Sequence, residues 1–148
     1  MIGKIITTCI LGLAITVNFS LGVFAQSKQS LQKLTDGDYF YGQSSAVDRN
    51  GVRYVILRKT GLTVIGRDYR YKSSDDWECF RGRINGNSIV DVTAGSEIFF
   101  KRTGRSRWEF GASEPKDLNK FYRLQFNQIP ANAKSGFLSC IEVFKNRK

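Results

Sequence analysis

The chain has 148 residues, no histidine, and 23 lysines and arginines against 13 aspartates and glutamates, so its net charge is +10. The absence of histidine excludes histidine-based catalytic triads, histidine-based ribonuclease sites and every histidine-ligated metal site. The positive charge favours anionic partners, such as acidic glycans, phosphate-bearing envelope polymers, anionic lipid or nucleic acid.

Residues 1–25 have the three parts of a secretory signal peptide. Lys4 precedes an apolar stretch from Ile5 to Val17, and Val23-Phe24-Ala25 places small residues at the positions that a signal peptidase reads. We therefore expect cleavage before Gln26 and an exported protein, in the periplasm, the cell envelope or the extracellular space. An uncleaved membrane anchor is the alternative, since residues 5–25 are just long enough to cross a bilayer, but the polar residues within them disfavour it.

Cleavage would leave 123 residues with a net charge of +9, which is enough chain for one modest hydrophobic core. No second apolar stretch in the sequence approaches the length of a membrane span. Residues 26–36 are polar and predict a loose lead-in, and residues 37–148 predict a single β domain.

The cysteines predict one disulfide. Cys9 lies in the signal peptide, so Cys79 and Cys140 remain as an even pair. In an oxidising compartment such a pair most often forms a disulfide, whereas a metal site would need further ligands in a chain that has no histidine. Closing a loop of about 60 residues would stabilise the fold by about 4 kcal/mol through the entropy of the unfolded chain.

From Gly37 onward, aromatic and β-branched residues come in short runs separated by glycine, asparagine or charged turns, which is typical of strands. The candidate strands are residues 39–42, 52–59, 62–71, 77–85, 88–93, 97–102, 107–110 and 121–127.

The turns between these runs predict how the strands are connected. Asn85-Gly86-Asn87 is the strongest hairpin signal, and Thr60-Gly61, Ala94-Gly95 and Thr103-Gly104-Arg105 indicate further turns. Strands joined by such short turns are antiparallel. The predicted fold class is mainly β, an antiparallel meander of about eight strands that closes into a small barrel or a sandwich, because closure removes exposed edges.

The C-terminal segment fits two structures. Phe137, Cys140, Ile141 and Phe144 have the i, i+3, i+4, i+7 spacing of an amphipathic helix, although Ile141 and Val143 also fit a strand. We predict a short helix that packs against the sheet and is tied to it through Cys140.

Two segments carry a resemblance: Gly37-Asp38-Tyr39-Phe40-Tyr41-Gly42, and the run from Cys79 to Ile89 that contains Asn85-Gly86-Asn87. Over residues 37–93 the chain resembles small exported β-rich proteins of unassigned activity that are common in cyanobacteria. The resemblance implies a compact, exported β domain, and it transfers no catalytic residue.

The sequence predicts no catalytic residue, metal or cofactor. A cysteine nucleophile is disfavoured, because both remaining cysteines are assigned to the disulfide and no histidine can act as the base. Asp75, Asp76 and Glu78 form the densest acidic cluster. Glycosidase chemistry needs two carboxyl groups that face each other across a cleft, and we interpret this cluster as a solvated turn instead.

Basic residues interleaved with aromatic residues form the more informative pattern. The candidate anion-binding residues are Arg81, Arg83, Lys101, Arg102, Arg105 and Arg107. The candidate aromatic contacts are Tyr69, Tyr71, Trp77 and Trp108. Aromatic faces stack on sugars or bases, and guanidinium groups pair with phosphate, sulfate or carboxylate. The alternative is that these cations are the wet faces of amphipathic strands and that the aromatics belong to the core.

We therefore predict a non-enzymatic binding or interaction module at the cell envelope, with an anionic polymer as the candidate partner. The first alternative is a small β-barrel that encloses an apolar ligand, with Tyr54, Ile56, Phe99 and Trp108 lining its interior. The second is a carboxylate-dependent hydrolase. No oligomeric state is predicted.

Overall fold

The structure is a computed structural model that describes residues 29–147; the predicted signal peptide lies outside the described residues. The strands are β1 (Gly37–Gly42), β2 (Arg53–Thr60), β3 (Thr63–Arg70), β4 (Trp77–Asn85), β5 (Ser88–Phe100), β6 (Arg105–Ala112), β7 (Lys116–Asp117) and β8 (Tyr122–Leu124). The helices are α1 (Ala131–Lys145) and the short 3-10 turns η1 (Leu31–Lys33), η2 (Leu118–Lys120) and η3 (Phe126–Gln128).

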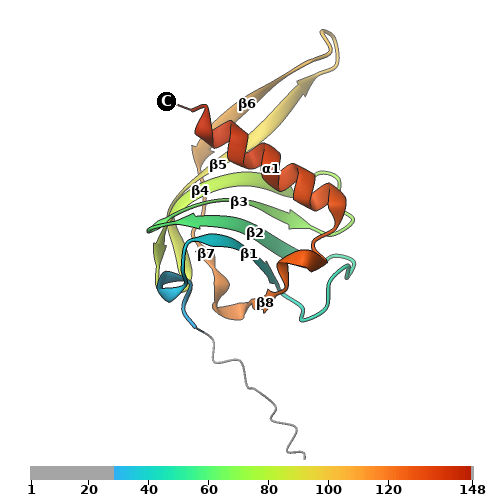
Figure 1. Cartoon of the computed structure of the whole chain (residues 1–148). Coiled ribbons are helices and arrows are strands. Elements are labelled where there is room, and N and C mark those ends of the chain that lie inside the picture. The colour runs from blue at the N-terminus through green and yellow to red at the C-terminus, as the bar shows by residue number, and fades with distance from the viewer. Residues whose placement is uncertain (1–28, 148) are drawn as a thin grey trace, which may run out of the picture.

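All eight strands belong to one antiparallel sheet, in the order β6-β5-β4-β3-β2-β1-β8, with β7 paired to the first residues of β5. Helix α1 crosses one face of this curved sheet (Figure 1). The predicted antiparallel β domain with a C-terminal helix is thus confirmed. Closure into a barrel is not shown because the sheet is open, and the eight strands form one sheet instead of the two sheets of a sandwich. None of the helices formed by the described residues is both long and apolar enough to cross a membrane.

The hairpin predicted at Asn85-Gly86-Asn87 is confirmed. Asn85 pairs with Ser88 across the turn, and Gly86 has a φ of +64°, a left-handed conformation that glycine adopts without steric cost. Strands β2 and β3 are joined by a similar short turn, in which Thr60 pairs with Thr63.

The turn predicted at Ala94-Gly95 is wrong, because both residues lie inside the continuous strand β5. Gly95 is opposite Phe110 on β6, and a Cβ added at Gly95 would come within 2.8 Å of the Phe110 ring. The glycine here lets an aromatic ring pack onto the strand, and one long strand replaces the two predicted at residues 88–93 and 97–102.

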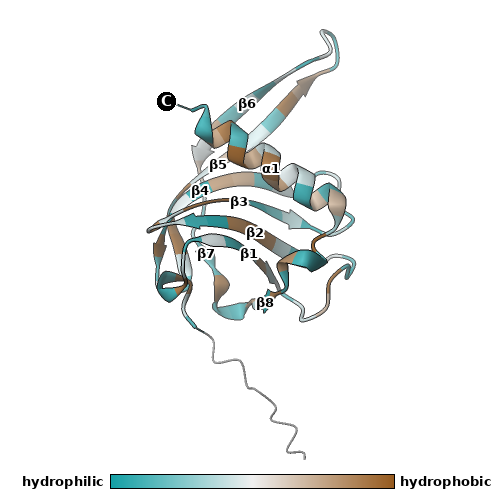
Figure 2. Ribbon diagram, viewed as in Figure 1, coloured by the Kyte–Doolittle hydropathy of each residue, from teal (hydrophilic) through white to brown (hydrophobic). Residues whose placement is uncertain are grey.

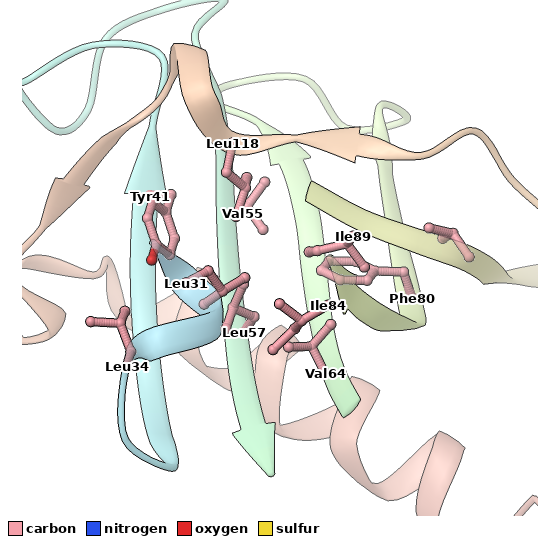
Figure 3. Packing of buried hydrophobic residues seen from close by; sticks show 11 residues of the cluster. Leu31, Leu34, Tyr41, Val55, Leu57, Val64, Phe80, Ile84, Ile89 and Leu118 are labelled. Carbon is pink, nitrogen blue, oxygen red and sulfur yellow. The ribbon is translucent and has the colours of Figure 1, made fainter. Parts of the chain in front are cut away.

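One side of the sheet, which we call the inner face, packs on the segments that cross it. Leu31 from η1 and Leu118 from η2 are buried there against Val55, Leu57 and Phe80 (Figure 3). Leu31 comes from the stretch predicted to be a polar lead-in, and its side chain is fully buried. This part of the inner face is therefore filled by the protein's own side chains.

The other side, the helix face, is covered by α1. Phe137, Cys140 and Phe144 are buried at the spacing that predicted the helix, and hydrophobic and hydrophilic residues alternate around it (Figure 2). Cys140 forms the predicted disulfide with Cys79 on β4, with 5.1 Å between the two Cα atoms. The disulfide therefore joins the last helix to the middle of the sheet.

Burial of Tyr41 on the inner face predicts a loss of stability at alkaline pH. Desolvation raises the pKa of the Tyr41 phenol to about 12 from its ordinary 10.0. Tyr41 therefore ionises at a lower pH in the unfolded chain than in the folded protein. The stability that its buried neutral phenol contributes is complete below pH 10.0 and is lost as the pH rises through about 12. We expect Tyr41→Phe to remove about 1 kcal/mol of the decline in unfolding free energy between pH 9 and pH 11, measured by urea denaturation. Tyr122→Phe, at an exposed tyrosine, should leave that decline unchanged, and an identical decline for both variants would contradict the expectation.

Candidate functional site

The β5–β6 hairpin projects beyond α1 and the rest of the sheet (Figure 1). Its outer part pairs Ile98 with Arg107 and Phe100 with Arg105, so the strands stay regularly hydrogen-bonded up to the turn. Gly104 closes the turn with a φ of +63°. We call residues 98–107 the hairpin tip.

Exposed hydrophobic and basic side chains share the hairpin tip. Phe99 is 62% exposed, and Ile98 and Phe100 are 36% and 39% exposed. The tip also carries four of the six predicted anion-binding residues, Lys101, Arg102, Arg105 and Arg107, and it contains no acidic residue.

Two contacts organise one face of the tip. The guanidinium of Arg107 lies over the ring of Phe100, 5.2 Å from its centroid, and also pairs with Glu109. Register places Ile98, Phe100, Arg105 and Arg107 on the continuation of the inner face, whereas Phe99 is on the continuation of the helix face. The tip therefore presents cations beside aromatic rings.

The other two predicted cations, Arg81 and Arg83, lie away from the hairpin tip. Both are on β4, and Arg83 pairs with Asp91 at 2.9 Å. On β5, Arg81 is opposite Thr93 and Arg107 is opposite Ile98. These two positions are five residues apart, so the two arginines are roughly 17 Å apart along the strand direction. The predicted basic residues therefore form two groups, and only the group on the hairpin is an uninterrupted basic cluster.

The predicted aromatic contacts belong mainly to the packing of the helix face. The ring centroids of Trp77 and Trp108 are 6.2 Å apart. Tyr69 is 7% exposed and stacks on Tyr54, while Tyr71 is partly buried in the same cluster. These rings fit the alternative in which the aromatics belong to the core. The exposed aromatics include instead Phe99 and Phe100 on the hairpin tip, and Tyr122 on β8.

A cavity of about 470 Å³ at one end of the inner face collects acidic residues. Six of the 13 acidic residues in the chain line it, beside Arg53 and Lys116. The six are Asp68, Asp75, Asp76, Glu78, Glu114 and Asp117.

Ion pairs neutralise much of the acidic cavity. The Nζ of Lys116 on β7 donates to Asp68 Oδ2 at 2.7 Å and to Glu78 Oε1 at 2.6 Å, so one ammonium group joins two neighbouring strands. Arg70 donates to Asp76, and this hydrogen bond is the main reason that the pKa of Asp76 is lowered. Asp68 and Glu78 thus share a cavity, but with a cation bound to both carboxylates. Within residues 29–147, no group of three or more acidic or cysteine side chains is arranged to hold a metal ion.

The buried Lys116–Asp68 pair was not predicted from the sequence. Its two residues are 48 positions apart, and only the fold brings them together. The sequence of β3 contained one signal for the pair. Val64, Gly66 and Asp68 are alternate residues that share the inner face, and a charged side chain on a buried face needs a partner. That pattern identifies Asp68 but not the lysine that pairs with it.

Comparison of the chain with protein-family models, with curated proteins and with solved structures found no match. Function is therefore inferred from the charges, exposure and geometry of the protein's own residues.

Proposed function

We propose that this protein is a non-enzymatic binding module that attaches to an anionic polymer through the hairpin tip. One observation carries the proposal: the projecting hairpin tip presents four basic residues and three exposed hydrophobic side chains, and no acidic residue lies among them. Arginine forks pair with phosphate, sulfate and carboxylate, and the aromatic faces of Phe99 and Phe100 can stack on sugar rings.

The shape of the hairpin favours an extended partner. The cations follow two paired strands and the turn between them, so they offer a line of positive charge rather than an enclosed pocket. Contiguous exposed apolar side chains in a small protein commonly mark an interaction surface, and Phe99 adds little to the core because it is 62% exposed. A flexible polyanion can follow such a line and release counterions as it binds.

Two further arrangements favour the binding module over the alternatives. Tyr54 and Ile56 are buried beneath α1 while Phe99 is on the hairpin, so these residues do not line a common interior for an apolar ligand. Asp68 and Glu78 are both bound by the ammonium group of Lys116, whereas a carboxylate-dependent hydrolase needs two carboxyl groups that face a substrate across a cleft. The Cys79–Cys140 disulfide is consistent with export, and we propose the cell envelope as the location of the protein.

We expect Arg105→Glu/Arg107→Glu to weaken binding to heparin, a sulfated polyanion, at least tenfold at low salt. The plot of log affinity against log salt should become shallower by about 2, because each neutralised charge contributes about one counterion. The measurement is fluorescence anisotropy of labelled heparin over a range of salt concentrations. Phe99→Ala should weaken binding without changing the slope.

The matched control is Arg49→Glu/Arg123→Glu, which changes the net charge equally at two exposed arginines away from the tip. Its affinity should fall much less than that of the hairpin variant. Equal affinities and slopes for the two double variants would refute the hairpin site, leaving only attraction to the net charge. Stronger binding to anionic phospholipid vesicles than to heparin would refute the polymer as partner.

A further inference from the structure

A second cationic site lies on the helix face, away from the hairpin tip. Arg67 on β3 extends beneath α1, with its guanidinium 4.9 Å from the centroid of the Trp77 ring and 5.7 Å from that of Tyr69. It lines a cavity of about 360 Å³ beside the first turn of α1. The other lining residues that matter here are Tyr69, Tyr71, Lys72, Asn132 and Ala133.

The charge of Arg67 has no counter-ion in the described part of the chain. None of the ion pairs or hydrogen bonds among residues 29–147 involves its guanidinium, and its Nε is buried without a hydrogen-bond partner. Burial lowers the pKa of Arg67, because removal from water disfavours the charged form. A cation–π contact offsets only part of this penalty, so the site is electrostatically incomplete as it stands.

The sequence of α1 leaves space for this arginine. Gly136 is in the interior of the helix, where glycine costs about 1 kcal/mol relative to alanine. A Cβ at Gly136 would overlap the guanidinium of Arg67, so any larger residue would displace it. Both the helix and the sheet therefore hold a partly desolvated cation in place at a cost in stability.

The cavity around Arg67 is positively charged. Lys72 is at its edge, with its ammonium over the ring of Tyr71, 5.9 Å from the centroid. Arg70 also lines the cavity, but its Nε donates to Asp76, so much of its charge is already paired. No acidic side chain is among the described residues that line this cavity.

We propose that the cavity is a binding site for a small oxyanion of the phosphate, sulfate or carboxylate class, with Arg67 as its main charged contact. An oxyanion would supply the missing counter-ion and accept hydrogen bonds from the guanidinium. Lys72 would add a second positive charge at the entrance. This site takes a compact anion rather than a polymer, and it is independent of the hairpin tip.

The test compares the wild type with Arg67→Met, which keeps an unbranched side chain beneath α1 but removes the charge. Isothermal titration with inorganic phosphate at constant ionic strength should show saturable binding to the wild type, weakened at least tenfold in Arg67→Met. The melting temperature of the wild type should rise in parallel, because a ligand stabilises the state that binds it. Arg123→Met, at an exposed arginine outside the cavity, should bind phosphate as the wild type does. Repeating the titration with sulfate and with citrate distinguishes the anion classes.

Stability without any added anion gives a second readout. If Arg67 awaits a ligand, Arg67→Met should be at least as stable as the wild type in chloride buffer, because it removes an uncompensated charge. Lys72→Gln, at the cavity edge, should weaken phosphate binding severalfold and gives the same test if Arg67→Met does not fold. The proposal is overturned if the wild type shows no saturable phosphate binding, or if Arg67→Met binds equally well. Phosphate also raises melting temperatures because it is excluded from the protein surface. An equal rise in the melting temperature of all variants would show only this general effect and would count against a specific site.

Discussion

Replacing Cys79 and Cys140 together by alanine is expected to lower the free energy of unfolding by about 4 kcal/mol. The disulfide joins residues 61 positions apart, so its loss returns a large conformational freedom to the unfolded chain. Both cysteines are also fully buried beside Phe144, so the missing sulfur atoms leave poorly filled space in the folded state. Guanidinium denaturation at neutral pH measures the difference.

Reduction of the wild type provides the control for the double variant. A thiol reductant should lower the stability of the wild type by a similar amount and should leave Cys79→Ala/Cys140→Ala unchanged. Non-reducing peptide mapping should recover the two cysteines joined. Unchanged stability after complete reduction would contradict the expected contribution of the disulfide.

Lys116→Met is expected to destabilise the protein by about 3–5 kcal/mol, because it leaves a carboxylate in the core without its main partner. The side chain of Asp68 is 5% exposed, and its second interaction, with Arg53, is longer at 3.4 Å. Lys116 also holds the segment after β6 against β3 and β4, so its loss should loosen β7. Urea denaturation of the variant and the wild type measures the effect.

Two matched variants separate the buried pair from a general effect of losing a lysine. Lys120→Met, at an exposed lysine nearby, should change the stability by less than about 0.5 kcal/mol. Lys116→Met/Asp68→Leu removes both charges and should recover much of the loss, since a buried pair replaced by apolar groups is often neutral. A loss below about 1 kcal/mol for Lys116→Met alone would show that water reaches Asp68 and solvates it.

Local sequence patterns predicted the parts of the fold that depend on neighbouring residues. Asn85-Gly86 placed a hairpin correctly because a left-handed turn requires a particular residue type at a particular position. The spacing of Phe137, Cys140 and Phe144 placed the C-terminal helix, because a helix brings those positions to one face. The even number of remaining cysteines placed the disulfide.

The candidate sites depended on contacts that such patterns do not contain. Gly95 suggested a turn, although its role is to accept the Phe110 ring from the next strand. Arg81 and Arg107 seemed parts of one patch until β5 proved to be continuous, which moves the hairpin away from the sheet. Arg67 lies two residues before Tyr69 in the sequence, but its place beneath the last helix follows only from the packing of α1 over β3.

The pairing of β1 with both β2 and β8 has a consequence for the order in which the protein folds. Strands β2 to β6 are joined by short connections and can form early, since closing short loops loses little entropy. Phe40 on β1 pairs with Leu124 on β8, so the β1–β8 edge of the sheet can form only after two segments that are far apart in the sequence have met. Until α1 arrives, Ile56 and its neighbours on the helix face remain uncovered, and an early sheet would be prone to self-association. The disulfide ties Cys140 on α1 to Cys79 on β4, so once it has formed it keeps the covering helix close to the sheet and limits that exposure.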